Sequence, residues 1–268
     1  MSQPTERLEP GEGRDPGRLV GSDRVLAVLR EVGGRPEGAT LEELAHAVAS
    51  PKPTVHRALV ALRRAGFAQQ DGHGRYCLGD EYLRLAFSYH QARPDHLRVR
   101  PVLEELAKRF GETAHYGVLD GRDIVYRAKA DPVSGAVHLT STVGGRNPAH
   151  STAIGLVLLA HRLPDLGAVR GWVGQGPLER RTARTLTTAA ELHACLVQIR
   201  HSGFAVDEEA NEPGVACVAL PVSLQPDPWP TGAISVTALT FRTPLADMVG
   251  RLPEIAEIVG PLAYRGAR

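Results

Sequence analysis

Apolar residues recur at helical spacing in two short segments near the N-terminus, separated by a proline-rich break. The first segment begins at Thr40, which forms with Glu43 the spacing of a reciprocal N-terminal capping box. A Ser-Pro-Lys-Pro segment ends it, and Pro53 suits the first turn of the next helix because its missing N–H would have no partner there. We expect this second helix from about Thr54 to Arg64, with Gly66 ending it. Its apolar stripe comprises Val55, Leu59 and Leu62.

After the second helix the pattern is typical of a β-hairpin. The segments FAQQ and RYCL flank residues 71–74, Asp-Gly-His-Gly, which form a glycine-rich turn. An earlier helix is expected over residues 22–32, ended by Gly33 and Gly34. The order helix, helix, turn, helix and hairpin predicts a winged helix-turn-helix.

Residues 79–91 form a further helical segment that would link this unit to the rest of the chain. Its apolar stripe comprises Tyr82, Leu85, Ala86 and Tyr89. No apolar segment of the hairpin is evident that would cover this stripe, which therefore predicts pairing with the same helix of another subunit. Pro94 closes the helix, and a new one is expected over residues 96–110 before Gly111.

The second half of the chain mixes strand and helix patterns. Apolar positions alternate before Asp120-Gly121 and resume in IVYRA, which predicts a hairpin. Other strand-like runs are FAV, AVHLTST, VACVALPV and GAISVTALTF. Helical runs interrupt them over residues 152–161, 188–202 and 245–262, and Thr188 with Glu191 repeats the capping-box spacing. We therefore expect an α+β domain with a mainly antiparallel sheet and helices packed around it.

Composition supports two domains. The chain has 268 residues, of which 43% are hydrophobic, so it can bury a substantial core. Residues 1–20 are rich in Glu, Arg, Gly and Pro and are expected to form a disordered tail without a secretory signal. The predicted boundaries are 21–79 for the winged helix-turn-helix, 80–93 for the linking helix and 94–268 for the second domain. No apolar run is long enough to cross a bilayer, so a soluble, cytoplasmic protein without a membrane partner is expected.

Positive charge is concentrated on the predicted second helix and hairpin, although the whole chain has a formal net charge of +1. Arg57 and Arg64 lie opposite the apolar stripe, as a surface that meets phosphates requires. Arg75 in the wing is expected to reach the neighbouring backbone or the minor groove. The full set of expected DNA-contacting residues is Lys52, Thr54, His56, Arg57, Arg64 and Arg75. A solvated charged face of a small helical subdomain is the alternative.

Three stretches resemble the IclR-type bacterial transcriptional regulators. PKPTVHRALVAL is similar to that family's recognition helix, with Pro53 in place of the usual serine. HSTAIGLVLLA at 150–160 and GFAVDEEANEPGVACVALPV at 203–222 resemble the most characteristic parts of its effector domain. The resemblance runs from about residue 22 to the C-terminus. It implies a GAF-like sensor fold, with effector binding and oligomerisation in residues 94–268.

The same resemblance implies partners and site residues. Double-stranded operator DNA would bind two units of a homodimer or a dimer of dimers, and a small organic acid or aromatic metabolite would be the effector. The residues that match the family's small-molecule site are Ala153, Ile154, Asp207, Cys217, Ser235 and Thr237.

The residues themselves favour one pocket. Residues 151–155 start a helix whose unpaired amides favour a carboxylate or another anion. Ser235 and Thr237 lie two apart in a strand and so share a face. Asp207 at the end of FAV and Cys217 within VACVA would complete a small set of polar groups in an apolar cavity.

Two alternatives stay open. In the first, Cys217 and Asp207 serve a metabolite-converting enzyme, although the Gly-x-Ser-x-Gly, phosphate-loop and Ser-x-x-Lys motifs are absent from the sequence. In the second, the protein binds DNA constitutively and its second domain only dimerises, which predicts no polar cavity beside Ser235. His115 and His150 lack metal-ligand spacing and the three cysteines are far apart, so no metal and no cofactor is expected. We expect a DNA-binding transcriptional regulator whose operator binding is modulated by a small-molecule effector.

Overall fold

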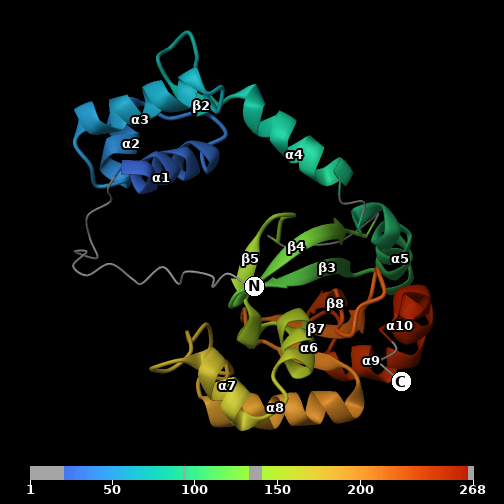
Figure 1. The fold of residues 1–268 in the computed structure, drawn as a ribbon. Coiled ribbons are helices and arrows are strands. Elements are labelled where there is room, and N and C mark those ends of the chain that lie inside the picture. The colour runs from blue at the N-terminus through green and yellow to red at the C-terminus, as the bar shows by residue number, and fades with distance from the viewer. Residues whose placement is uncertain (1–20, 93–94, 133–140, 265–268) are drawn as a thin grey trace, which may run out of the picture. The chain divides into compact units, whose positions relative to one another are not determined.

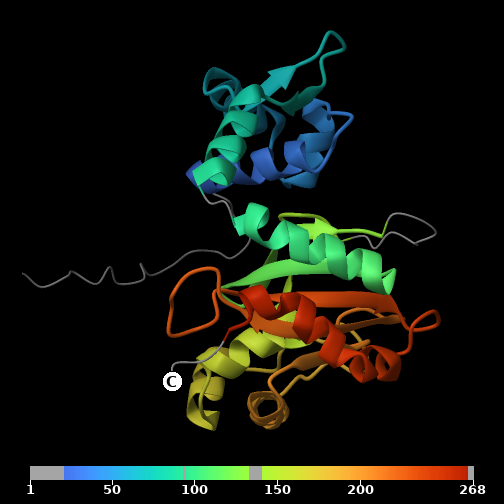
Figure 2. The ribbon, with the colours of Figure 1, turned by 90° about the vertical axis from the view of Figure 1, so that its right-hand side faces the viewer.

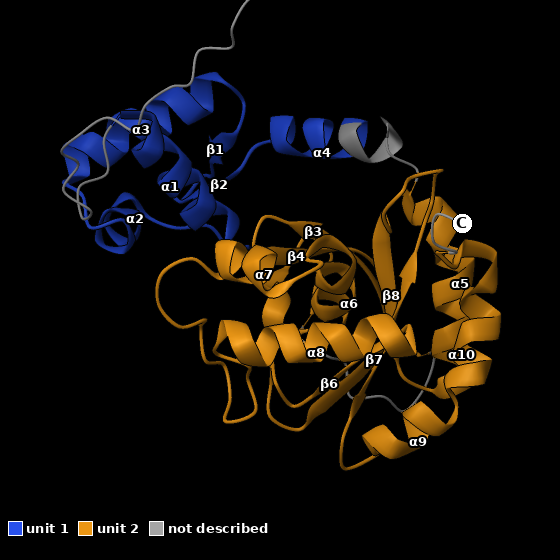
Figure 3. Ribbon diagram, turned by 60° about the horizontal axis from the view of Figure 1, so that its bottom comes forward, with its two compact units in different colours: residues 1–93 blue, residues 94–268 orange. Residues whose placement is uncertain are grey.

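The computed structural model describes residues 21–92, 95–132 and 141–264, with side chains described up to residue 88 in the first range (Figure 1). The chain forms two compact units, residues 1–93 and residues 94–268 (Figure 3). Each unit has its own buried apolar residues.

Three helices surround the apolar core of the first unit. They are α1 (Gly21–Gly33), α2 (Leu41–Ala47) and α3 (Lys52–Arg64). Val28, Leu44, Val55 and Leu59 are fully buried where the three helices meet. The capping box of α2 is present, since Thr40 N donates to Glu43 Oε2 at 2.8 Å and Glu43 N donates to Thr40 Oγ1 at 3.2 Å. The third helix begins at Lys52, two residues before its expected start. Pro51 is the residue that precedes its first turn.

A two-stranded hairpin follows α3. Strands β1 (Ala68–Gln70) and β2 (Tyr76–Leu78) pair in antiparallel register, as predicted. Asp71 closes the turn, because its carboxylate accepts from the amides of His73 and Arg75. Tyr76 also pairs with Ala39 in an isolated bridge, which ties the hairpin to the loop between α1 and α2.

Helix α4 (Asp80–Ala92) exposes apolar side chains on more than one face. Tyr82 and Leu85 of the expected stripe are exposed, and so are Leu83 and Phe87, which lie outside it. The side chain of Tyr89 lies outside the described residues.

The second unit is built on a six-stranded sheet with the order β5-β4-β3-β8-β7-β6. All of its pairings are antiparallel, which confirms the predicted sheet type. The strands are β3 (Thr113–Asp120), β4 (Asp123–Ala130), β5 (Arg146–Pro148), β6 (Ala205–Glu208), β7 (Val215–Val222) and β8 (Gly232–Leu239).

Helices cover both faces of this sheet (Figures 1 and 2). One face carries α5 (Asp95–Phe110), α9 (Leu245–Gly250) and α10 (Leu252–Val259). The other carries α6 (Ala153–Arg162), onto which α8 (Ala189–Ser202) packs, and α7 (Leu166–Val173), which packs on α8. Short 3₁₀ turns lie at Ala149–Ser151 and Gly260–Leu262. Two apolar cores result, one on each face of the sheet.

The structure corrects several expected elements. Residues 245–262 were expected as one helix, but they form two helices and a 3₁₀ turn because Pro253 cannot continue an α-helix. Helix α7 was missed because its two glycines disfavour helix, and it is capped by Asp165, which accepts from Ala168 N at 2.8 Å. Strand β6 extends to Glu208, past the expected end of FAV, so Asp207 lies within it. Most of AVHLTST lies outside the described residues, while its last two residues are not in a strand.

Candidate functional site

Helix α3 has a buried face and a charged outer face. Its buried side chains are Val55, Ala58, Leu59 and Leu62, as the apolar stripe predicted. The exposed polar side chains are Lys52, His56, Arg57, Arg63 and Arg64, while Thr54 is half-buried. The helix therefore packs by one side and presents a row of cations and hydrogen-bond donors on the other.

The cations on this face remain available to an anionic partner. Within the described part of the chain, no carboxylate lies within ion-pair distance of Arg57 or Arg64. Lys52 Nζ lies 2.9 Å from Glu42 Oε1, but both side chains are more than half exposed, so this pair is weak. Phosphates could therefore approach Arg57 and Arg64 without first breaking an internal ion pair.

Arg75 makes contacts within the protein. Its Nη2 donates to the carbonyl oxygen of Gly38 at 2.7 Å, and its Nε donates to that of Glu37 at 3.1 Å. The same Nη2 lies 3.5 Å from Glu43. The Arg75 guanidinium is thus directed to the loop before α2, where it holds the hairpin.

Cross-strand register brings together the polar residues of the second unit. Asp207 on β6 pairs with Cys217 on β7, which pairs with Thr237 on β8. Ser235 on β8 pairs with His115 on β3. Paired residues and residues two apart in a strand point to the same face, so all five side chains lie on one side of the sheet. That side is the one covered by α6.

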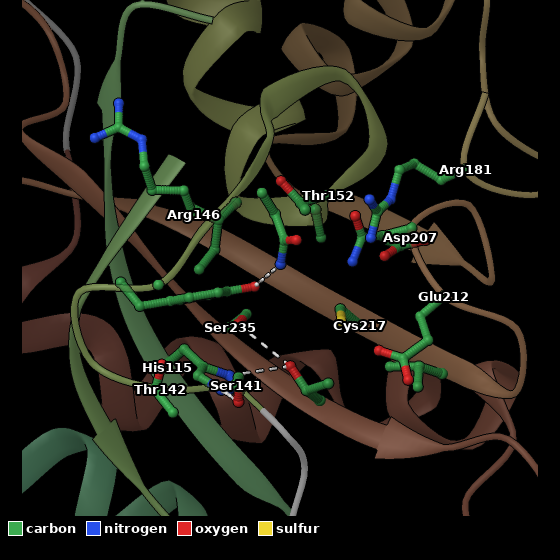
Figure 4. Close-up of a pocket in the computed structure, with 18 residues that line it drawn as sticks. His115, Ser141, Thr142, Arg146, Thr152, Arg181, Asp207, Glu212, Cys217 and Ser235 are labelled. Carbon is green, nitrogen blue, oxygen red and sulfur yellow. Dashed lines mark hydrogen bonds between the residues drawn. The ribbon is translucent and has the colours of Figure 1, made fainter. Parts of the chain in front are cut away.

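A cavity of about 310 Å³ lies between this sheet face and the start of α6 (Figure 4). All six residues predicted for the small-molecule site line it: Ala153, Ile154, Asp207, Cys217, Ser235 and Thr237. If the second domain served dimerisation alone, no polar cavity would be expected beside Ser235. The structure has a cavity there.

Further polar side chains line the cavity that were not among the predicted site residues. They include His115, Tyr126, Arg146, Asn147, Arg181 and Asn211. A signal for His115 was present, because it alternates with Ala114 and Tyr116, which are buried in the core on the opposite face. Arg146 reaches the rim and pairs with Asp120 at 2.6 Å and with Asp123 at 3.3 Å. Arg181 comes from the long connection between α7 and α8, whose position no local pattern predicts.

The first turn of α6 is held against the cavity. Thr152 is its N-cap and accepts from Gly155 N at 3.1 Å. Ser151 Oγ lies 3.0 Å from the Asn211 amide oxygen, which ties this turn to the loop after β6. The amides of Ala153 and Ile154 precede Gly155 in the same turn, where a helix offers no internal acceptor. The positive end of a helix favours a negative group beside such a turn.

Asp207 has an unusual acidity. Its carboxyl is buried, and Oδ1 accepts from Ala210 N at 2.7 Å. Burial raises the pKa of Asp207 to about 7, although hydrogen bonds from the amides of Ala210 and Asn211 oppose this rise. Near neutral pH the carboxyl therefore exists in both protonation states.

Cys217 does not have the properties of a nucleophile. Burial raises the pKa of its thiol, and the neighbouring Asp207 charge raises it further, while a hydrogen bond with Thr237 lowers it. A nucleophilic cysteine requires the opposite shift, toward the thiolate. The chemistry of this site therefore does not support the enzymatic alternative.

The described residues contain no group of three or more His, Cys, Asp or Glu side chains placed to hold a metal ion. Across the same residues, no helix combines the length and apolar character that a bilayer crossing needs.

Comparison with known proteins identifies the family. Residues 22–72 match the sequence model of the IclR helix-turn-helix domain, and residues 96–259 match that of the bacterial transcriptional regulator IclR C-terminal domain. The chain belongs to the IclR family of bacterial transcriptional regulators. It is therefore a DNA-binding regulator and not an enzyme, and its second unit is an effector-binding domain of that family.

Individual relatives are similar in sequence to this protein over most of its length. The Pca regulon regulatory protein of Pseudomonas putida is 31% identical over 222 residues, which cover 83% of this chain and 75% of that protein. The transcriptional regulator BhcR of Paracoccus denitrificans is 32% identical over 252 residues, which cover 93% of this chain and 88% of that protein.

Solved structures share the fold. The regulator RHA06195 of Rhodococcus sp. RHA1 is 30% identical, with a TM-score of 0.73 over 88% of this chain and 94% of that one. An IclR homologue of Microbacterium hydrocarbonoxydans, solved in complex with 4-hydroxybenzoate, has the same fold at 22% identity, with a TM-score of 0.70 over 88% of this chain and 95% of that one.

Proposed function

We propose that the cavity between α6 and the sheet binds a small carboxylic acid, and that this binding changes the affinity of the regulator for its operator. The observation that carries the proposal is the convergence of six predicted residues on one cavity of about 310 Å³. A volume of this size is typical of small-molecule sites.

The start of α6 is the proposed carboxylate site. The amides of Ala153 and Ile154 and the positive end of the helix dipole would favour an anion there. Arg181 also lines the cavity, and its ion pair with Glu179 is a long one at 3.4 Å between exposed side chains. The sheet side of the cavity offers the hydroxyl groups of Ser235 and Thr237 and the Asp207 carboxyl, which is partly protonated near neutral pH.

The rest of the ligand is proposed to be a short chain or a single ring. Tyr126, Ile154 and Val215 supply apolar surface in the same cavity, so an aliphatic or an aromatic acid would fit. The Microbacterium homologue was solved with an aromatic hydroxy acid, which makes benzoate derivatives suitable probes for this chain.

The DNA-binding form is proposed to be a homodimer or a dimer of dimers that binds a pseudo-palindromic operator. Helix α4 exposes Leu83 and Phe87, whose burial against a second copy would stabilise a dimer. Two copies of α3 would then enter the major groove at two half-sites, with Thr54 and Arg57 contacting phosphates or bases. The effector would shift the arrangement of the two DNA-binding units only by its difference in affinity for the two states.

A ligand screen on the purified full-length protein tests this proposal. The operator is first located by footprinting upstream of the protein's own gene. Small hydroxy, oxo and unsubstituted carboxylic acids, with benzoate derivatives, are then measured by thermal shift and by operator binding in fluorescence anisotropy. A true effector raises the melting temperature by mass action and changes operator affinity.

Two variants sharpen the result. Asp207→Ala should weaken the response to an active acid without changing operator binding in its absence. Cys195→Ala, at a partly exposed cysteine on α8 that does not line the cavity, serves as the matched control. If no acid changes either the melting temperature or the operator affinity, constitutive DNA binding is the better account.

A further inference from the structure

A buried histidine joins two hydroxyl groups across the cavity. The side chain of His115 is only 2% exposed and lines the cavity from β3 (Figure 4). Its Nε2 lies 2.8 Å from Ser141 Oγ, and its Nδ1 lies 3.3 Å from Thr237 Oγ1. Thr237 Oγ1 lies 3.5 Å from Ser235 Oγ. The result is a chain of polar groups, Ser141, His115, Thr237 and Ser235, all four of which line the cavity.

The ring at the centre of this chain is neutral. Burial lowers the pKa of His115 to about 4, and the positive charge of Lys129 acts in the same direction, while Asp131 opposes it. Lys129 also donates to the carbonyl oxygen of Ser141 at 3.0 Å, which holds this residue beside the ring. The Tyr126 ring packs against the imidazole with a centroid distance of 4.8 Å.

A neutral imidazole donates from one nitrogen and accepts at the other, whereas a hydroxyl group does both. The chain can therefore be polarised in two directions. When Nδ1 carries the proton, it donates to Thr237, Thr237 donates to Ser235, and the Ser235 hydroxyl is left to donate to a ligand. When Nε2 carries the proton, the order reverses, and Ser235 donates to Thr237 and offers the ligand only a lone pair.

We infer that His115 is the specificity-determining residue of this cavity, and that it selects acids with an uncharged oxygen substituent, either a carbonyl or a hydroxyl group. A ligand carbonyl facing Ser235 would select the Nδ1–H tautomer, and a ligand hydroxyl that donates to Ser235 would select the Nε2–H tautomer. This inference rests on the proposed binding of a carboxylic acid at the start of α6, and it names the second group of that acid.

The alternative role is packing alone. A packing residue needs no polar partner, but both nitrogens of this ring lie within hydrogen-bond distance of hydroxyl groups of residues that line the cavity. An acid without the oxygen would leave the Ser235 end of the chain without a partner, and an unpaired buried polar group is the usual cause of strong discrimination between ligands.

Matched ligands provide the test. The probes are benzoate with its hydroxy and formyl derivatives, and propionate with lactate and pyruvate, titrated calorimetrically into the full-length protein. In the series that binds, the best hydroxy and oxo acids should bind about tenfold more tightly than the unsubstituted acid. His115→Phe, which keeps an aromatic ring, should reduce this preference to about twofold or less. His115→Gln should restore most of this preference, because the glutamine amide has both a donor and an acceptor and can flip to exchange their positions.

Nitrogen NMR of the histidine rings in the wild-type protein supplies a readout that packing alone would not change. The shifts of the two ring nitrogens should show the Nδ1–H tautomer with the oxo acid and the Nε2–H tautomer with the hydroxy acid. One tautomer in both complexes, or an undiminished preference in a folded His115→Phe protein, would overturn the role of His115 while leaving acid binding intact. If no acid in either series binds the wild-type protein, the proposed function and this inference fail together.

Discussion

Arg57 and Arg75, two arginines of one basic segment, have different surroundings. The Arg57 side chain is exposed on α3, whereas Arg75 donates to two backbone carbonyls of the loop before α2. Their net charges are identical, so only the positions of nearby acceptors distinguish them. The two residues therefore lead to different predictions.

Arg57→Ala should weaken operator binding without destabilising the fold. Loss of one contact is expected to cost about 1–3 kcal/mol of binding free energy, and a lost phosphate contact would lower the salt dependence by about one counterion. Fluorescence anisotropy at several salt concentrations measures both quantities. Arg170→Ala, at an exposed arginine on α7, removes the same charge from the other unit and should leave both unchanged. Undiminished affinity of the Arg57 variant would count against the assigned helix face.

Arg75→Ala should show the reverse pattern. Removal of its hydrogen bonds to Glu37 and Gly38 should destabilise the first unit by about 1 kcal/mol, since the group is partly screened by water. The salt dependence of operator binding should stay as in the wild type. Thermal unfolding and salt titrations of Arg75→Ala and Arg64→Ala, measured side by side, test this assignment. A salt slope reduced by Arg75→Ala would return this residue to the DNA interface.

Asp207→Asn should change how the stability of the second unit depends on pH. The folded carboxyl has a pKa of about 7, against an ordinary value of 3.8, so between these values the folded protein holds a proton that the unfolded chain has lost. Stability therefore falls as pH rises from about 4 to about 7, by at most about 1.4 kcal/mol per pH unit, and then levels off.

The asparagine variant keeps an acceptor for Ala210 N but has no titratable group, so its stability relative to the wild type should increase from pH 5 to pH 8. Melting temperatures of both proteins across this range measure the difference. His115 titrates in both proteins, so its contribution cancels. A constant difference would show that Asp207 has an ordinary pKa.

At the scale of the element, the docking of α6 depends on one glycine. A Cβ atom at Gly155 would overlap the carbonyl oxygen of Ala149 in the preceding 3₁₀ turn. The Ala149 atoms that it would meet belong to the backbone and cannot turn aside as a flexible side chain can. The first turn of α6 can therefore lie against Ala149 only without a side chain at this position. Ala153 and Ile154, which line the cavity, belong to the same turn.

Gly155→Ala should destabilise the second unit by several kcal/mol, as overpacking against backbone does, and should abolish acid binding. Gly171→Ala is the matched control, because a Cβ at this helical position of α7 meets no atom within 4 Å. It should be neutral or stabilise the protein by about 0.5–1 kcal/mol. Thermal shift with and without an active acid compares the two variants. Equal stability of the two variants would show that α6 can shift without cost.

At the scale of the whole molecule, the proposed dimer depends on α4. Leu83 and Phe87 are 53% and 63% exposed, and exposed apolar groups of this size favour burial against another surface. The double variant Leu83→Glu with Phe87→Glu should weaken self-association and should lower operator affinity at dilute protein. The Arg84→Glu variant changes charge on the same helix without removing apolar surface.

Sedimentation velocity across a concentration series measures the association, and anisotropy with a half-site and a full-site operator measures its effect on DNA binding. An unchanged dimer in the double variant would place the interface elsewhere. Reduced full-site affinity with normal half-site affinity would support two copies acting together.

Structural features that depend on a few neighbouring residues could be predicted from the sequence alone. The capping boxes at Thr40 and Thr188 and the left-handed Gly203 after α8 involve neighbours within a turn, so composition and spacing were sufficient to place these helix ends. The antiparallel sheet followed from strand patterns that each lie within about ten residues. These features depend on local backbone geometry, which a short sequence window contains.

The cavity depends on contacts between distant segments. Its six predicted residues came from the family resemblance, but the register that aligns Asp207, Cys217 and Thr237, and the placing of His115 against Ser141, arise when β3, β6, β7 and β8 pair beneath α6. The intramolecular acceptors of Arg75 could not be foreseen for the same reason, since they lie 37 and 38 residues earlier in the chain. Patterning sets which face of an element is buried. The acceptor that a polar side chain then reaches is set by packing between segments, because that packing brings distant atoms within bonding distance.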